Sequence, residues 1–325
     1  MTDFDYLQPK TLEEASSLLQ KSKRKAIPYS GGTDALSLLK EDIISPGEVV
    51  NLKKIPNLNA ISYENGKGLK IGGLVTINVI AENSLIAEKY KVLSEAANKI
   101  ASPQLRNVGT LGGNLNQRPR CWYFRKDFDC IRKGGSICYA VDGENKYHCI
   151  IGGGPCYIVH PSDMAVALLA LDASVNIFSG KKSKTIPMSE FFILPDVNHL
   201  KENILEPGEI LTEVIVPELP PNSRSGYYKF MERDVWDFAV VSVAVVLTKN
   251  ANSIKNGKIA YGGVAPAPWL DKKLNNSLNG LAIDDNSIEK AVSQILSDAE
   301  PLEQNEYKIP LARNITRNMI KKLTA

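Results

Sequence analysis

The sequence lacks the features that mark export, membrane insertion or nucleic-acid binding. Residues Met1–Asp5 are acidic and have neither the basic nor the apolar stretch of a secretory signal. No run of 18 uninterrupted apolar residues is present, so we predict no membrane insertion. The net charge of +3 arises from 39 basic and 36 acidic residues scattered along the chain, which predicts no nucleic-acid partner. We therefore expect a soluble, cytoplasmic protein, although a subunit exported together with a signal-bearing partner would look the same.

Motifs of self-contained catalysis are absent as well. The sequence has no H-E-x-x-H zinc motif, no G-x-S-x-G nucleophile motif and no Walker phosphate-binding loop. We therefore predict that the chain has no catalytic residues of its own. With 43% apolar and 23% charged residues, the composition is that of an ordinary globular protein, and 325 residues suit two or three domains.

Predicted helices and strands alternate irregularly over the first 110 residues. Thr11-Leu12-Glu13-Glu14 is a capping-box pattern that predicts the start of a helix, and Ala26–Tyr29 predicts a short strand. The irregular order favours an α+β fold over a doubly wound sheet. Further helices are predicted at 77–87 and 90–100, and further strands at 48–52 and 69–73.

Three prolines between residues 217 and 225 predict a linker and a domain boundary near residue 220. Beyond it, alternating large apolar residues at 241–247 predict a sheet with one buried face. The other elements predicted for this part are strands at 227–231, 239–247 and 259–262, and helices at 288–296 and 311–323.

Two glycine-rich segments stand out. Ser30–Asp34 follows the predicted strand Ala26–Tyr29, and Gly109–Asn114 follows the predicted helix 90–100 and a connecting segment that carries Pro103. Glycine pairs let the backbone approach a ligand closely, and free amides at a helix start favour a phosphate. One such segment alone is more typical of a tight turn. Two of them match what a dinucleotide pyrophosphate needs when the protein supplies no metal ion.

All five cysteines lie within 36 residues, a clustering that packing alone would not produce. A disulfide framework is disfavoured by the odd number and by the missing secretion signal. Gaps of eight, seven, ten and six residues fit the paired knuckles of a structural zinc site poorly. An iron–sulfur cluster tolerates less regular spacing, so spacing alone leaves both cluster and zinc open. The cysteines are Cys121, Cys130, Cys138, Cys149 and Cys156.

Basic residues surround the first cysteines. They can offset the negative charge of a thiolate-ligated centre, face an acidic redox partner, or simply belong to a solvated loop. These residues are Arg118, Arg120, Arg125, Lys126, Arg132 and Lys133.

The order of the motifs resembles that of one protein family. The glycine segments, the cysteine loop, His160-Pro161-Ser162-Asp163 and Tyr-Tyr-Lys-Phe-x-x-Arg-x-x-x-Asp-Phe-Ala at 227–239 follow one another as in the FAD-binding medium subunits of the molybdenum hydroxylases. This is the xanthine dehydrogenase and aldehyde oxidoreductase family. The resemblance implies an α+β fold with a vanillyl-alcohol oxidase-type FAD-binding domain of two subdomains at 1–220 and a smaller α+β domain at 221–325.

The resemblance also implies which residues bind FAD. The two glycine segments are similar to the family's pyrophosphate loops, and Asp163, Leu211 and Lys229 match its other flavin contacts. The alternatives are core packing for Leu211 and a surface position for Lys229. The loop residues are Ile27, Pro28, Tyr29, Ser30, Gly31, Gly32, Thr33 and Asp34, and Thr110, Leu111, Gly112, Gly113 and Asn114.

The cysteine loop at about 118–157 is similar to the extra loop of the 4-hydroxybenzoyl-CoA reductase medium subunit and of the bacterial periplasmic-type aldehyde oxidoreductases, where four cysteines bind a [4Fe-4S] cluster. Cys149 then remains as a buried thiol, although a fifth cysteine leaves a swap open. His148 and His160 are expected to be hydrogen-bonded structural residues rather than ligands. The cysteines that fall on the family's ligand positions are Cys121, Cys130, Cys138 and Cys156.

The function implied by the resemblance is electron transfer. The subunit would bind FAD and a [4Fe-4S] cluster and pass electrons between a [2Fe-2S] small subunit, which serves a molybdopterin-binding large subunit, and an external carrier such as a ferredoxin-like protein. Residues 261–269 favour the aldehyde oxidoreductase branch over the 4-hydroxybenzoyl-CoA reductase branch. Two alternatives from other classes are a zinc-stabilised scaffold module without a redox role and a self-contained flavin oxidase.

Overall fold

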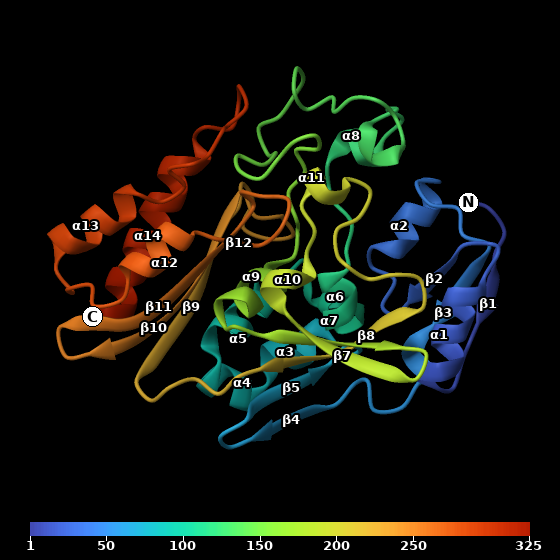
Figure 1. Cartoon of the computed structure of the whole chain (residues 1–325), viewed down its shortest axis with the longest axis horizontal. Coiled ribbons are helices and arrows are strands. Elements are labelled where there is room, and N and C mark those ends of the chain that lie inside the picture. The colour runs from blue at the N-terminus through green and yellow to red at the C-terminus, as the bar shows by residue number, and fades with distance from the viewer.

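The computed structural model describes residues 1–325 and contains three separate β-sheets with helices packed around them, so the predicted α+β fold is confirmed (Figure 1). The sheets have the strand orders β1-β3-β2, β4-β5-β8-β6-β7 and β12-β11-β10-β9. The strands are β1 (Asp5–Leu7), β2 (Ala26–Tyr29), β3 (Glu48–Asn51), β4 (Ile61–Glu64), β5 (Gly68–Gly72), β6 (Ser174–Ser179), β7 (Lys182–Pro187), β8 (Glu209–Val216), β9 (Ser223–Phe230), β10 (Val241–Asn250), β11 (Ser253–Gly262) and β12 (Trp269–Leu270). The α-helices are α1 (Leu12–Lys21), α2 (Ala35–Lys40), α3 (Ile77–Glu82), α4 (Ser84–Lys89), α5 (Lys91–Asn98), α6 (Pro103–Val108), α7 (Leu111–Leu115), α8 (Trp122–Arg125), α9 (Asp163–Ala170), α10 (Met188–Phe191), α11 (Pro195–Asn198), α12 (Lys272–Ser277), α13 (Asp285–Ser293) and α14 (Lys308–Thr324), and the 3₁₀ turns are η1 (Leu52–Lys54) and η2 (Ile131–Lys133).

The three-stranded sheet near the N-terminus is parallel, with β3 between β1 and β2. Helix α1 begins where the sequence predicts, because the Thr11 hydroxyl accepts the N–H of Glu14 at 3.2 Å. The Glu14 carboxylate accepts the N–H of Lys10 at 2.9 Å, one residue before the position of a full capping box. Leu19 is buried against Val50 of β3, and this contact fixes the helix on the sheet.

The five-stranded sheet is antiparallel and belongs to the largest core, a cluster of 34 buried residues. Helix α9 is buried along its whole length, because it carries only apolar side chains after Asp163. The prediction of one helix at 77–87 is wrong at Asn83. Extended backbone there ends α3, and the Asn83 side chain caps α4 by accepting the N–H of Ile86 at 3.0 Å.

The four-stranded sheet forms a second core, of 21 buried residues, with the C-terminal helices. The prediction of one buried face is wrong, because both faces of β10 are covered. Val243 and Val245 pack with α14, whereas Ala244 and Val246 belong to the core around α9. Strand β9 begins at Ser223, so the chain is extended and paired before the end of the predicted linker. The division of the chain into domains at residue 220 stays a prediction.

The loop that carries the cysteines crosses the upper side of the molecule in Figure 1 with little regular structure beyond α8 and η2. Tyr123 and Phe124 of α8 pack on Leu38 of α2 in a small separate core. At the other end of the loop, the Asn145 N–H donates to the Gln304 side chain at 3.2 Å, just before α14. The loop is therefore held by both the N-terminal and the C-terminal parts of the chain.

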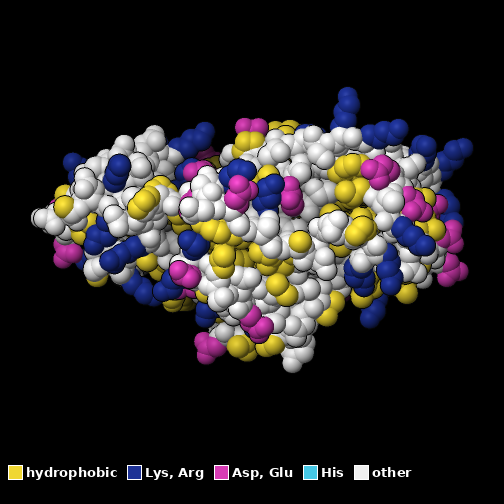
Figure 2. Space-filling model, turned by 90° about the horizontal axis from the view of Figure 1, so that it is seen from below, with side chains coloured by type: hydrophobic (Ala, Val, Ile, Leu, Met, Phe, Trp, Pro, Cys, Tyr) yellow, Lys and Arg dark blue, Asp and Glu magenta, His cyan; other side chains and the backbone are white.

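Charges of both signs are interspersed on the face shown in Figure 2, where hydrophobic atoms gather near the middle. No helix combines the length and the apolar character needed to cross a membrane.

Candidate functional site

The two glycine segments contact each other directly. The Ser30 hydroxyl lies 2.9 Å from the Thr110 hydroxyl, which also accepts the N–H of Gly113 at 3.1 Å. A side chain at Gly31 would collide with the second segment, since its Cβ would lie 2.1 Å from the carbonyl oxygen of Val108. Glycine is thus required at position 31 by the close approach of two backbones.

The second glycine segment is helical, and so is the segment before it. Ser102 caps α6, in which Pro103 occupies the first turn, where the sequence predicts only a connecting segment. Thr110 caps α7, and α7 runs through both Gly112 and Gly113. The caps, rather than the helix propensity of glycine, start these short helices.

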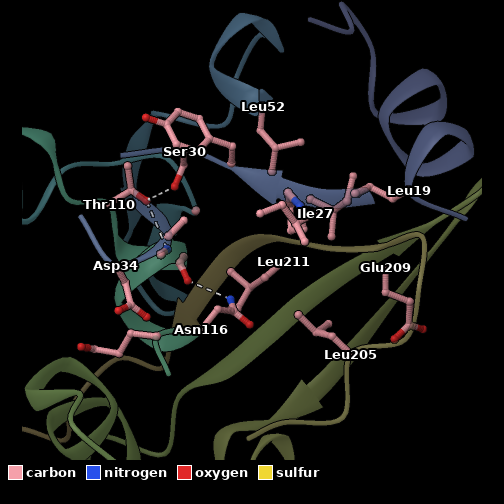
Figure 3. A pocket seen from close by; sticks show the side chains of 18 of the residues that line it. Leu19, Ile27, Ser30, Asp34, Leu52, Thr110, Asn116, Leu205, Glu209 and Leu211 are labelled. Carbon is pink, nitrogen blue, oxygen red and sulfur yellow. Dashed lines mark hydrogen bonds between the residues drawn. The ribbon is translucent and has the colours of Figure 1, made fainter. Parts of the chain in front are cut away.

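A cavity of about 750 Å³ lies beside the two segments (Figure 3). All of residues 27–34 line it, together with Thr110, Gly112, Gly113 and Leu211. In Figure 3 the side chains of Ser30 and Thr110 point toward one another at its polar end, while Leu19, Ile27 and Leu205 surround its apolar end. Leu111 lines no part of it, because its side chain is fully buried in the main core.

The first glycine segment presents free backbone donors to this cavity. The N–H groups of Gly31, Gly32 and Thr33 donate to no acceptor of the protein. Consecutive unpaired N–H groups form an anion-binding concavity. The arrangement fits a pyrophosphate, which would satisfy these donors.

A second cavity of about 300 Å³ lies against the same segments. Thr33, Asp34, Thr110 and Gly113 line both cavities, so the two share a wall. Of the other residues predicted to contact the flavin, Asn114, Asp163 and Lys229 line the second cavity.

Asp163 and Lys229 come together as a buried ion pair at 2.8 Å. Lys229 also donates to the carbonyl of Lys99 at 3.1 Å, and the Tyr227 hydroxyl donates to the other Asp163 oxygen. Burial and the Asp163 charge hold the pKa of Tyr227 well above its usual value. Lys229 is therefore no surface residue; it fixes a carboxylate at the edge of the second cavity.

Sequence reasoning missed several residues that line the cavities. Gln117 lines both, and Asn116 lines the larger one, where it accepts a hydrogen bond from Asn203 at 2.8 Å. Helical spacing from Thr110 through Gly113 to Gln117 was the available signal. Leu205 and the other residues at 205–210 come from a distant segment and carry no motif.

The cysteines predicted as ligands gather in one region. Cys121, Cys130 and Cys138 belong to the small core of the loop, and the Cys138 and Cys156 thiols are hydrogen-bonded to each other. All five thiols are free. No three Cys, His, Asp or Glu side chains converge as ligands of a single metal ion. The donor set is thus collected in one place without forming a closed single-ion site.

The thiols differ in how readily they ionise. Burial raises the pKa of Cys121 to about 11 and holds that of Cys149 far above its usual value. The hydrogen bond between Cys138 and Cys156 lowers the pKa of Cys138, to about 6, and raises that of Cys156. Within this pair, Cys138 is thus the thiol that ionises more readily.

Four of the six basic residues, all of them arginines, form ion pairs within the protein instead of pointing freely into solvent. Arg120 and Arg125 donate to Asp34 at 2.6 and 2.8 Å. The other two share a second carboxylate, that of Glu202, at 2.7 Å for Arg118 and 2.5 Å for Arg132. The two lysines of the group, Lys126 and Lys133, are exposed.

His148 and His160 are buried. The His148 Nε2 lies 3.3 Å from the Cys121 sulfur, and the His160 Nδ1 accepts the N–H of Ser162 at 3.4 Å. Each ring keeps its other nitrogen buried without a partner. Burial lowers the pKa of His148 to about 4 and that of His160 to about 3, so both rings stay neutral at pH 7.

Lys308, at the start of α14, is fully buried beneath the cysteine loop. Its ammonium donates to the carbonyls of Tyr147, His148 and Gly263 at 2.8, 2.8 and 2.6 Å. Burial lowers the pKa of Lys308 to about 7. The contact ties the loop to the C-terminal helix.

Two adjoining cavities, which share a wall of backbone beside free amides in an α+β fold, suit an extended dinucleotide. Residues 2–219 match the family described as the FAD binding domain in molybdopterin dehydrogenase, and residues 226–323 match the CO dehydrogenase flavoprotein C-terminal domain. The chain therefore belongs to the FAD-binding medium subunits of the molybdenum hydroxylases and is a flavoprotein subunit of an oxidoreductase. This confirms the predicted family and FAD as cofactor.

Known relatives cover the chain almost from end to end. It is 32% identical to the aldehyde oxidoreductase FAD-binding subunit PaoB of Escherichia coli (strain K12), over 98% of both chains. It is 24% identical to the carbon monoxide dehydrogenase medium chain of Afipia carboxidovorans, over 99% of this chain and 97% of that one. The fold is similar to a chain of CO dehydrogenase from Oligotropha carboxidovorans, with a TM-score of 0.79 and 23% identity over 100% of this chain and 99% of that one.

Proposed function

We propose that this protein is the electron-transfer subunit of a molybdenum hydroxylase complex of the aldehyde oxidoreductase type and that it binds a [4Fe-4S] cluster in addition to FAD. It would assemble with a molybdopterin-binding large subunit and a [2Fe-2S] small subunit, and exchange electrons with an external carrier. PaoB, which is named as the FAD-binding subunit of an aldehyde oxidoreductase, supports this assignment through its 32% identity. The cofactors supply the redox chemistry, and the chain supplies binding, orientation and electrostatics.

The shape of the two cavities supports one extended FAD molecule. The shared wall of Thr33, Asp34, Thr110 and Gly113 lies between them, next to the free amides of the first glycine segment. We propose that these amides hold the pyrophosphate, so that the adenosine end lies in the larger cavity and the flavin ring in the smaller one. Arg120 lines the smaller cavity and brings a positive charge to the side where the flavin ring would lie.

Within the chain, the observation that carries the cluster proposal is the gathering of Cys121, Cys130, Cys138 and Cys156. Cys121, Cys130 and Cys138 pack in the small core of the loop, and Cys156 lies next to Cys138. A zinc ion needs its four ligands around a single point, and no such group is present. Ligands of a four-iron cluster stand further apart, since the cluster itself lies between them. The choice of a cluster over zinc rests on the resemblance of the cysteine loop to the cluster-binding loops of the family.

The buried charges around these cysteines fit an anionic centre. Arg132 is 4% exposed and lies 3.8 Å from the Cys156 sulfur, and the His148 ring contacts the Cys121 sulfur. Hydrogen bonds and positive charge at the sulfurs stabilise the reduced state of an iron–sulfur cluster. We propose that Cys149 takes no part, because its thiol is fully buried and burial keeps it protonated.

The test is the iron, zinc and flavin content, with a visible spectrum, of the full chain purified anaerobically with its copurifying subunits. The expected result is about four irons and one FAD per chain, with a broad brown absorption that dithionite bleaches. FAD without iron would contradict the cluster proposal. Stoichiometric zinc in its place would return the loop to a structural role. Steady oxidation of a substrate with oxygen by the isolated chain would instead identify a self-contained flavin oxidase.

A further inference from the structure

Asp34 joins the first glycine segment to the cysteine loop. It ends the segment that lines both cavities, and its side chain is 13% exposed. One carboxylate oxygen accepts Arg120 at 2.6 Å and Arg125 at 2.8 Å, and the other accepts the backbone N–H of Arg118 at 2.7 Å. All three partners lie within four residues of Cys121. The side chain makes no capping bond to α2, the helix that it precedes, because the loop uses its oxygens instead.

The same network continues from Arg118 to the last cysteine. Arg118 donates to Glu202 at 2.7 Å, Glu202 accepts Arg132 at 2.5 Å, and Arg132 contacts the Cys156 sulfur at 3.8 Å. Four guanidinium groups and two carboxylates leave a net charge of +2 in the network. This charge lies between the phosphate-binding segment and the thiols, so it reduces the repulsion between an anion on one side and a thiolate-ligated centre on the other.

The FAD site and the cysteine site therefore both depend on the same ion pairs between Asp34 and the loop arginines. The cysteine loop has little regular secondary structure, and a cluster on its cysteines would fix the residues around Cys121. Arg120 and Arg125 would then be held against Asp34, and the glycine segment would be ordered before FAD arrives. A ligand that finds its site already ordered binds with a smaller loss of conformational entropy. The expected coupling is positive, and it must be equal in both directions.

We propose that Asp34 couples the two cofactor sites, so that a cluster on the cysteines tightens FAD binding and bound FAD slows the loss of the cluster. The inference rests on the [4Fe-4S] cluster of the proposed function. Asp34 acts here as a positioning residue, through its ion pairs with Arg120 and Arg125. If Asp34 only contacted FAD, its substitution would lower FAD affinity equally with and without the cluster. A coupling role predicts instead that the substitution removes the effect of the cluster on FAD affinity.

The experiment compares the dissociation constant of FAD for the full chain with and without its cluster, using flavin fluorescence. The cluster-free protein carries Cys138→Ser and Cys156→Ser. We expect loss of the cluster to raise the Kd about tenfold or more when Asp34 is present, and by less than about twofold in the Asp34→Asn background. In the reciprocal measurement, FAD should slow iron release to a chelator by the same factor in the wild type and have no effect in Asp34→Asn.

Two further variants complete the test. Arg125→Gln removes the opposite partner of the same ion pair and should also abolish the coupling, which covers the case in which Asp34→Asn does not fold. Asp5→Asn is the matched control, since Asp5 forms an exposed ion pair with Arg24 elsewhere in the N-terminal part, and it should keep the coupling. The coupling inference would be wrong, and the proposed cluster would stand, if the wild type holds four irons but binds FAD equally well without them. The same holds if the coupling persists without Asp34. Absence of iron from the wild type would instead overturn the proposed cluster.

Discussion

At the scale of single residues, the burial of His160 contributes to the loss of stability in acid. Its pKa falls from 6.5 to about 3 because the ring is buried. The unfolded chain therefore takes up a proton first as the pH falls below 6.5, and folding stability is lost between pH 6.5 and about 3. At pH 5 this one ring should destabilise the fold by about 2 kcal/mol relative to pH 7. Urea unfolding at both pH values should show a loss that is smaller by that amount in His160→Asn, and an unchanged loss would contradict the burial argument.

Whether a cysteine binds the proposed cluster is also decided residue by residue, and Cys149 is expected to differ from Cys121 and Cys138. Cys121→Ser and Cys138→Ser each remove a proposed cluster ligand, so both should lose most of the iron. At FAD concentrations well above the raised Kd, both should still bind FAD, because the cavity-lining residues of the two glycine segments are unchanged. Cys149→Ser is the matched control and should keep about four irons. Iron and flavin analysis of the three variants checks this. Retention of four irons in both ligand variants, or loss of iron from Cys149→Ser, would show that the ligand set is wrong.

At the scale of elements, the contact between the two glycine segments limits what position 31 accepts. In Gly31→Ala the new Cβ would meet the carbonyl of Val108 and the Cα of Gly109, both backbone atoms that a side-chain rotation cannot move. We expect the segments to separate and FAD affinity to fall by more than about tenfold, which corresponds to about 1.4 kcal/mol. Fluorescence titration with FAD measures the change. Gly180→Ala is the control: its Cβ meets no atom, and its positive φ of 63° should cost about 1 kcal/mol of stability without altering FAD affinity.

How far the sequence could predict these elements depended on local chemistry. The start of α1 and the strand at 26–29 before the first glycine segment follow from capping and turn residues, and the structure contains them. Helices α6 and α7 escaped prediction, since their caps Ser102 and Thr110 were hidden among glycine and proline. The partners of the loop arginines could not be predicted either. Glu202 lies 84 residues from Arg118, and only tertiary packing brings the two together.

At the scale of the whole molecule, Lys308 holds the cysteine loop onto the C-terminal part. Lys308→Met would leave the carbonyls of Tyr147 and Gly263 buried without their donor, while the His148 carbonyl keeps its hydrogen bond from the Asn305 side chain at 3.2 Å. We expect a loss of about 3 kcal/mol in the free energy of unfolding, because two buried acceptors lose their donor. Urea denaturation measures it. Lys272 is exposed, so Lys272→Met serves as control and should change stability by less than about 0.5 kcal/mol. An equally small effect at Lys308 would mean that its hydrogen bonds to the loop contribute little to stability.

The smaller cavity is lined by Asp163, from the segment 2–219 that matches one family, and by Lys229, from the segment 226–323 that matches the other. The cavity therefore lies where the two segments meet. A chimaera that joins residues 1–219 of one relative to the C-terminal segment of another must preserve the fit of Asp163 to Lys229 across the junction. The two segments are therefore not interchangeable modules, and they are expected to diverge as a matched pair.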